Sequence, residues 1–80
     1  MNPREVAELI RTGLPDADIH VESADDRHFT ARIVAREFAG LKRIARHQLI
    51  YHALGEPMGR EIHALSIDAL SPEEWAARTS

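Results

Sequence analysis

The chain contains no cysteine among its 80 residues. Disulfide bridges are therefore excluded, and so is a metal site built only from the chain's own thiolates. A chain this short buries about 60–65% of its unfolded surface, which leaves no room for a large substrate cavity. With 44% hydrophobic and 29% charged residues, the composition is that of an ordinary soluble globular protein. We expect a single domain over residues 1–80.

The first half of the chain predicts one helix and one hairpin. Apolar residues recur at helical spacing over residues 3–12, and the run Asn-Pro-Arg-Glu at the start is a capping pattern. Gly13 is expected to end this helix. Apolar and polar residues then alternate over 19–22 and 28–35, which predicts two strands joined by a polar turn.

The second half predicts a helix, a strand and a short closing helix. The helical period returns over 41–54, and alternation returns over 62–70. Ser71 opens a Ser-Pro-Glu-Glu capping box that starts the last helix. An additional helical turn is expected near Phe38 or after Leu54.

These elements follow the order α-β-β-α-β-α, which indicates an α+β fold of two layers. We expect the helices to cover one face of a three-stranded sheet. The third strand should run parallel to a hairpin strand, because a helix crosses over before it. The sheet is therefore expected to be mixed.

Positive charge is concentrated in the middle of an acidic chain. Ten Lys and Arg residues against 13 Asp and Glu residues give a net charge of −3 and a pI near 5.9. Between residues 27 and 46 the balance reverses, with six basic residues and one acid. This segment is either a solvated face or a surface that attracts an anionic partner.

The sequence offers no arrangement for catalysis. Its carboxylates fall mainly in turns and helix starts, and no pair is held on a buried face for acid–base work. No glycine-rich phosphate loop occurs, and the serines have no visible base. We therefore expect a protein that is not an enzyme.

The start of the chain is polar where a signal peptide would be apolar. No stretch approaches the ~18 apolar residues of a membrane-spanning helix. We expect a cytoplasmic protein with no membrane association.

Five histidines are the unusual count in this composition. His20 is predicted on the polar face of a strand, and His47 and His52 lie on the second predicted helix. His28 and His63 each open a strand, and each is either a structural residue or a metal ligand. No pair has the spacing of a self-contained metal site. Two imidazoles could nevertheless hold a [2Fe–2S] cluster if a second protein supplied two thiolates.

The second predicted helix begins with a basic face. Lys42, Arg43, Arg46 and His47 could bind phosphate groups of a nucleic acid. The Gly-x-x-Gly loop by which KH domains clamp a nucleic-acid backbone is absent, because the pattern that starts at Gly40 has Arg43 in place of its second glycine. Aromatic residues for base stacking are also scarce.

Four short motifs, taken together in this order, resemble the BolA family. They are Phe38-Ala39-Gly40-Leu41, Arg46-His47-Gln48 followed by Ile50-Tyr51, Ile62-His63-Ala64-Leu65, and Pro72-Glu73-Glu74-Trp75. The likeness covers residues 3–77. The hairpin, with Val21-Glu22 and Arg27-His28-Phe29, resembles the IbaG-like branch of that family.

The resemblance implies a fold similar to class II KH domains and a function without catalysis. BolA-like proteins pair with monothiol glutaredoxins and share a glutathione-supported [2Fe–2S] cluster, in iron–sulfur trafficking or iron sensing. Glutathione comes from the partner side, and no cluster is expected on the chain alone, which should be a monomer or weak homodimer. Some members are described as DNA-binding transcriptional regulators in the stress response.

The resemblance also implies which residues bind the cluster. His63 matches the family's cluster histidine, and its second ring nitrogen should be held by an acceptor. The other family ligand is a Cys or His in the hairpin loop, but residues 23–27 contain neither. His28 at the end of that loop is the expected substitute, with His47 left open. In the family's Arg-His-Arg helix motif the third residue is here Gln48, which weakens the DNA interpretation.

The partner surface is expected to include His63 and the basic face from Arg32 to Arg46. That face could steer an acidic glutaredoxin towards the site. A structural adaptor that binds an apo partner without any metal remains an alternative.

Overall fold

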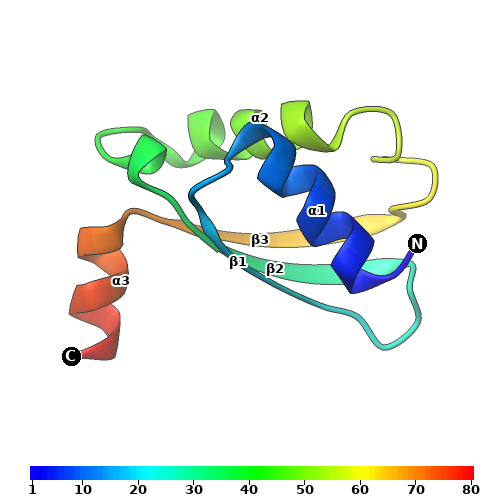
Figure 1. Cartoon of the computed structure of the whole chain (residues 1–80), viewed down its shortest axis with the longest axis horizontal. Coiled ribbons are helices and arrows are strands. Elements are labelled where there is room, and N and C mark those ends of the chain that lie inside the picture. Colours follow the sequence, from blue (N-terminus) through cyan, green and yellow to red (C-terminus); the bar gives the residue numbers. More distant parts are fainter.

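Three strands form one mixed sheet in the computed structural model, which describes residues 1–80 (Figure 1). β1 (Asp18–Glu22) pairs antiparallel with β2 (His28–Val34), and β2 pairs in parallel with β3 (Ala64–Leu70). β2 is therefore the central strand. The predicted hairpin and the predicted parallel third strand are confirmed, although β3 begins two residues later than the alternation suggested.

The helices complete an α+β fold in the predicted order. α1 (Pro3–Gly13) and α2 (Arg43–Leu54) lie on one face of the sheet, and α3 (Pro72–Thr79) follows β3 at its end (Figure 1). A 3₁₀ turn (Arg36–Phe38) precedes α2, as expected near Phe38. No helix combines the length and apolar character needed to cross a bilayer.

Both predicted capping boxes are present. The side chain of Asn2 accepts a hydrogen bond from the Glu5 amide at 2.9 Å, and the Glu5 carboxylate accepts one from the Asn2 amide at 3.0 Å. At α3, Ser71 Oγ accepts from the Glu74 amide at 3.3 Å, and Glu74 Oε1 accepts from the Ser71 amide at 2.7 Å. Each box satisfies two amide groups that would otherwise have no partner at a helix start.

The core lies between the sheet and the two helices that cover it. Alternate residues of β2 point into it, as the predicted period of two requires. The buried cluster consists of Val6, Ile10, Leu14, Phe29, Ala31, Ile33, Ala35, Phe38, Ile50, Leu54 and Ile62. Burial of the apolar residues on one face of the sheet thus sets the positions of the ends of the strands and of the polar residues there.

Gly13 has a different role from the one predicted. It lies inside α1 as the last helical residue, and the C-cap that follows is Leu14. A Cβ atom on Gly13 would lie 2.8 Å from the Cβ of Ala53 in α2, closer than two nonbonded carbon atoms normally approach. The glycine is therefore required by the close packing of α1 against α2.

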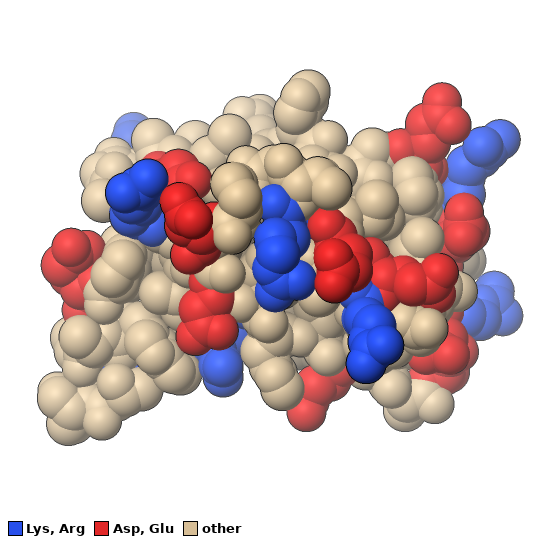
Figure 2. Space-filling model, in the orientation of Figure 1, with Lys and Arg blue, Asp and Glu red and all other residues tan.

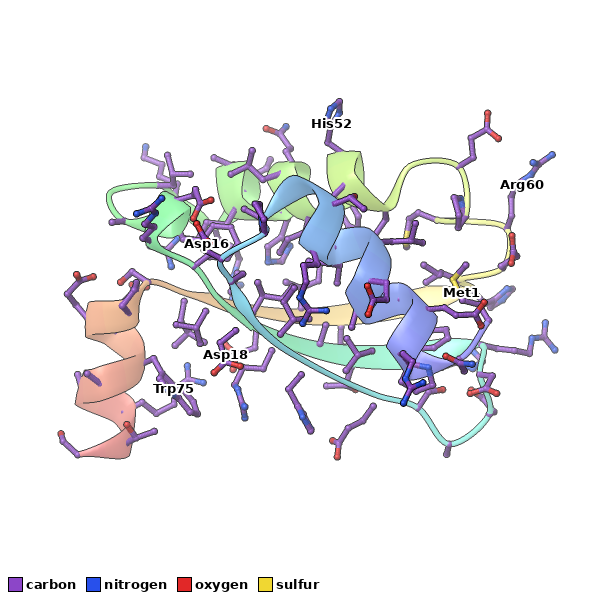
Figure 3. The ribbon with its side chains drawn as sticks, in the orientation of Figure 1. Met1, Asp16, Asp18, His52, Arg60 and Trp75 are labelled. Atoms are coloured by element: carbon purple, nitrogen blue, oxygen red, sulfur yellow. The ribbon has the colours of Figure 1, made fainter.

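The prediction that all helices share one face is wrong for α3. Trp75 of α3 packs on the opposite, open face of the sheet, where the guanidinium carbon of Arg32 lies 4.4 Å from its ring centroid (Figure 3). Val34 and Leu70 also point to that face and are buried, although the strand pattern there is otherwise polar. These apolar side chains give α3 a surface to cover.

Candidate metal centre

The parallel pairing of β2 with β3 brings two of the predicted ligands together. His28 is the first residue of β2, and His63 immediately precedes β3, whose first residue is paired with His28. The two rings are arranged edge to face, with 5.4 Å between their centroids and 74° between their planes. Both residues are exposed. Two imidazoles therefore lie side by side at one end of the sheet, accessible from outside.

A compact turn organised around Asp25 presents His28. Asp25 Oδ1 accepts hydrogen bonds from the amides of Arg27 at 3.0 Å and His28 at 2.9 Å. Ser23 Oγ accepts from the Asp26 amide at 2.9 Å and donates to the His28 carbonyl at 2.7 Å. Asp26 adopts the left-handed conformation, with φ of 58°, as the turn requires. The backbone at His28 is thus held from two sides.

Asp25 also contacts the ring of His28. Its Oδ2 lies 2.7 Å from Nδ1, a distance typical of a charge-assisted hydrogen bond. Hydrogen bonds to its ionised form hold the pKa of the Asp25 carboxyl well below its usual range. In decreasing order of effect they come from the His28 amide, the His28 ring and the Arg27 amide. Asp25 is therefore ionised at neutral pH.

His63 is held less firmly. Its amide donates to the carbonyl of Arg27 at 2.9 Å, which ties the start of β3 to the hairpin turn. Its ring nitrogens have no hydrogen-bond partner within the chain, so the acceptor predicted for His63 is absent. The ring of His28 has such an acceptor instead, the carboxylate of Asp25. The acceptor went unrecognised in the sequence, although a turn of the form Ser-x-Asp followed by His is a recognisable hydrogen-bonding pattern.

The pair cannot complete a metal site by itself. No group of three or more His, Asp or Glu side chains in the structure could hold a metal ion. Two imidazoles fit the donor set of one iron in a [2Fe–2S] cluster whose other iron carries two thiolates. With no cysteine in the chain, those thiolates have to come from another molecule.

His47, the alternative second ligand, lies far from this pair. It lines an open pocket of about 410 Å³ between α2, the C-terminal half of β3 and α3. The β3 residues that line this pocket begin at Ile67, four residues beyond His63, which at about 3.3 Å per residue is about 13 Å along the chain. The structure therefore brings His28, and not His47, beside His63.

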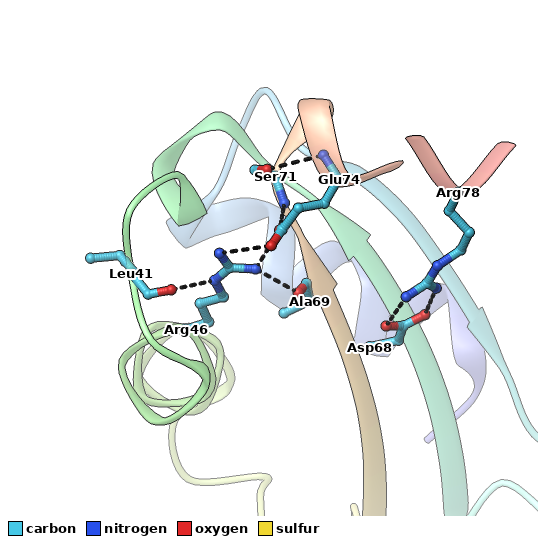
Figure 4. A network of polar contacts seen from close by, with 7 residues as sticks. All are labelled: Leu41, Arg46, Asp68, Ala69, Ser71, Glu74 and Arg78. Atoms are coloured by element: carbon cyan, nitrogen blue, oxygen red, sulfur yellow. Dashed lines mark hydrogen bonds and ion pairs between the residues drawn. The ribbon is translucent and has the colours of Figure 1, made fainter. Parts of the chain in front are cut away.

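Arg46 has an internal role instead of the predicted contact with DNA or a partner. Its side chain is only 12% exposed. Nε donates to the carbonyl of Leu41 at 2.9 Å, and Nη1 donates to the carbonyl of Ala69 at 3.0 Å and to Glu74 Oε1 at 2.6 Å (Figure 4). Arg46, together with the Ser71 amide, lowers the pKa of Glu74 to about 2. Arg46 thus joins α2, β3 and α3, and its charge is paired with that of Glu74.

The predicted basic face from Arg32 to Arg46 does not exist as one surface. Arg32 lies on the open face of the sheet against Trp75, whereas α2 covers the other face. Arg36 pairs with Asp16 at 3.5 Å. On the face shown in Figure 2, basic and acidic side chains are interspersed. Folding therefore distributes the charges that are neighbours in sequence.

The exposed cations that remain on α2 are at its start. Lys42 is the N-cap, and Arg43 begins the helix and lines the pocket with His47. Arg78 also lines it and binds Asp68 at 2.5 Å. His52, which the sequence places on the second predicted helix, is exposed and points away from the sheet (Figure 3).

Several known proteins are similar to the chain in both sequence and structure. The chain matches the family of BolA-like proteins over residues 5–74. It belongs to the BolA-like family. The narrower assignment of this BolA-like chain to the IbaG-like branch stays a prediction.

One relative is the DNA-binding transcriptional regulator BolA of Haemophilus influenzae. It is 37% identical over 59 residues, which cover 74% of this chain. The BolA-like chain spans 57% of the length of that relative.

Two solved structures are similar over nearly the whole chain. A BolA protein homologue from Coxiella burnetii is 34% identical with a TM-score of 0.85, covering 95% of this chain and 97% of that one. The BolA domain of SufE1 from Arabidopsis thaliana is 31% identical with a TM-score of 0.79, covering 90% and 93%. The α+β fold described above is thus the BolA fold.

Proposed function

We propose that this protein is a non-enzymatic cytoplasmic partner that supplies two imidazole ligands, from His28 and His63, to a [2Fe–2S] cluster. The cluster is shared with a monothiol glutaredoxin, whose cysteine and bound glutathione supply the thiolates. The observation that carries the proposal is the pairing of the two exposed rings, 5.4 Å between centroids, in a chain without cysteine. Membership of the BolA-like family supports it.

When bound, such a cluster supplies one-electron chemistry, and imidazole ligation raises its reduction potential relative to an all-thiolate cluster. The chain contributes the position of its two rings at the sheet end and leaves the remaining side of the site to the partner. Because no pocket of the chain encloses this pair, the cluster would lie between two proteins. A site of this kind suits iron–sulfur trafficking or iron sensing.

Reconstitution tests the proposal directly. A monothiol glutaredoxin, glutathione, iron and sulfide are combined without oxygen, with and without this protein, and visible absorption and circular dichroism are recorded. We expect a changed spectrum on mixing, which is lost with His63→Ala and retained with His52→Ala, an exposed histidine on α2. A spectrum that is unaffected by the wild-type chain, or unchanged by His63→Ala, contradicts the proposal.

The same experiment separates the adaptor alternative. A complex that co-elutes with glutaredoxin, shows no spectral change and is indifferent to iron and glutathione would identify a cluster-free adaptor.

DNA binding is the second candidate function. The name of the Haemophilus relative favours it, as do the exposed Lys42 and Arg43 at the start of α2. Phosphate contacts by these residues predict an affinity that falls steeply with salt and falls further in a Lys42→Ala, Arg43→Ala double variant. Weak binding with a flat salt dependence rejects this function.

A further inference from the structure

One carboxylate holds both the backbone and the ring of His28. Asp25 uses Oδ1 for the amides of Arg27 and His28, and Oδ2 for Nδ1 of the His28 ring. Ser23 adds further support to the same turn through its bonds to the Asp26 amide and the His28 carbonyl, and its Oγ also donates to Asp25 Oδ1 at 3.3 Å. The ring contact of Asp25 is therefore an addition to a turn that already has other support.

This contact determines which ring nitrogen of His28 carries the proton. A carboxylate can only accept a hydrogen bond, so a neutral ring facing Asp25 Oδ2 has its hydrogen on Nδ1. The lone pair is then on Nε2, which has no partner in the chain. Histidines that bind metals commonly donate their other N–H to a carboxylate in this way.

The two rings are unequal in this respect. His63 has no acceptor for either ring nitrogen, and its ring contact within the site is the edge-to-face packing against His28. His28 is thus oriented by a carboxylate before any ligand arrives, whereas the ring of His63 has no such hydrogen bond.

We infer that Asp25 is a positioning residue that fixes the Nδ1–H tautomer of His28 and presents Nε2 as the ligating nitrogen. The inference rests on the proposed function only for the identity of the bound group. Asp25 itself does not touch the cluster; it acts through the ring of His28.

The variant Asp25→Asn separates positioning from turn structure. An asparagine oxygen can still accept from the two backbone amides, as the aspartate Oδ1 does. Its NH₂ group replaces Oδ2 and can only donate, so it favours a ring with its proton on Nε2. Asp26→Asn is the matched control, because the hydrogen bond to the ring comes from Asp25 and not from the Asp26 side chain.

The tautomer is measured first, in the full chain without metal, by long-range ¹H–¹⁵N NMR of the imidazole nitrogens. We expect the Nδ1–H form for His28 in the wild type and in Asp26→Asn, and the Nε2–H form in Asp25→Asn. A wild-type His28 in the Nε2–H form overturns the inference without any variant. So does an unchanged tautomer in a folded Asp25→Asn.

Cluster binding with glutaredoxin is measured second. We expect Asp25→Asn to weaken binding by about 10–100-fold and to shift the reduction potential, while Asp26→Asn matches the wild type. Wild-type affinity and potential in Asp25→Asn overturn the inference while leaving the proposed function intact. If the wild type binds no cluster, the proposed function fails, and the NMR result still decides whether Asp25 sets the tautomer.

Discussion

Nη1 of Arg46 lies 2.6 Å from Oε1 of Glu74, which joins α2 to α3 across the end of β3. The same carboxylate oxygen accepts the Ser71 amide at the start of α3. One glutamate therefore caps a helix and neutralises an arginine that is mostly buried. Loss of its charge should loosen both contacts together.

The first prediction concerns acid stability. The pKa of Glu74 falls from 4.5 to about 2 in the folded state, mainly because Arg46 hydrogen bonds to the ionised carboxylate. A lowered pKa contributes stability above pH 4.5 that disappears as the pH falls towards 2. We expect Glu74→Gln to be less stable than wild type at pH 7, with the difference shrinking over that window.

Urea unfolding at a series of pH values measures this difference. Glu73→Gln is the control, since Glu73 is exposed and makes no ion pair or side-chain hydrogen bond. A difference between Glu74→Gln and wild type that stays constant from pH 7 to pH 2 would contradict the assignment.

The second prediction concerns the contact of Gly13 with Ala53. An alanine normally stabilises an exposed helix by up to about 1 kcal/mol relative to glycine. Here the added methyl would lie 2.8 Å from the rigid Cβ of Ala53, so Gly13→Ala should cost about 1–3 kcal/mol of unfolding free energy. Chemical denaturation checks the sign. In an Ala53→Gly background the same substitution should cost much less, and equal costs in both backgrounds would exclude the contact as the cause.

The third prediction compares two isoleucines of α2. Ile50 is fully buried in the core, whereas Ile44 is 68% exposed. We expect Ile50→Ala to lower the unfolding free energy by about 2–5 kcal/mol and Ile44→Ala to change it by about 0.5 kcal/mol or less. Similar values for both variants, measured in urea, would show that α2 is packed with another face inwards.

The fourth prediction separates folding from ligation at His63. The residue is exposed and its ring makes no hydrogen bond, so His63→Ala should leave the unfolding free energy within about 0.5 kcal/mol of wild type. The cluster spectrum with glutaredoxin should nevertheless be lost. A variant that unfolds in the same measurement would indicate a structural histidine.

Much of the fold could be read from the sequence because its signals are local. The two capping boxes and the switches between helical and strand periods predict the elements to within a few residues. The parallel pairing of β3 with β2 follows from the helix that crosses between them. The resemblance to BolA proteins predicts His63 as one ligand, and the position of His28 at the end of the hairpin loop makes it the predicted second ligand.

What could not be read depends on contacts between distant residues. Arg46 appears in sequence as one cation of a basic helix, and its internal role depends on Glu74 and on a carbonyl of β3. Arg32 lies against Trp75, a contact that exists only once α3 covers the face of the sheet opposite α2. Gly13 resembles a helix terminator, and its close approach to Ala53 exists only once the helices pack.

The parallel arrangement of β2 and β3 has a consequence for how the histidine pair comes into being. The hairpin of β1 and β2 carries His28 and its carboxylate partner, and it is a local structure. His63 joins them only after α2 has crossed the sheet and β3 has docked, which is a pairing of residues distant in sequence. A chain in which β3 has not docked presents His28 without His63 and therefore lacks the ligand pair of the proposed function. Under the proposed function, only a chain whose last strand is in place would therefore bind the cluster.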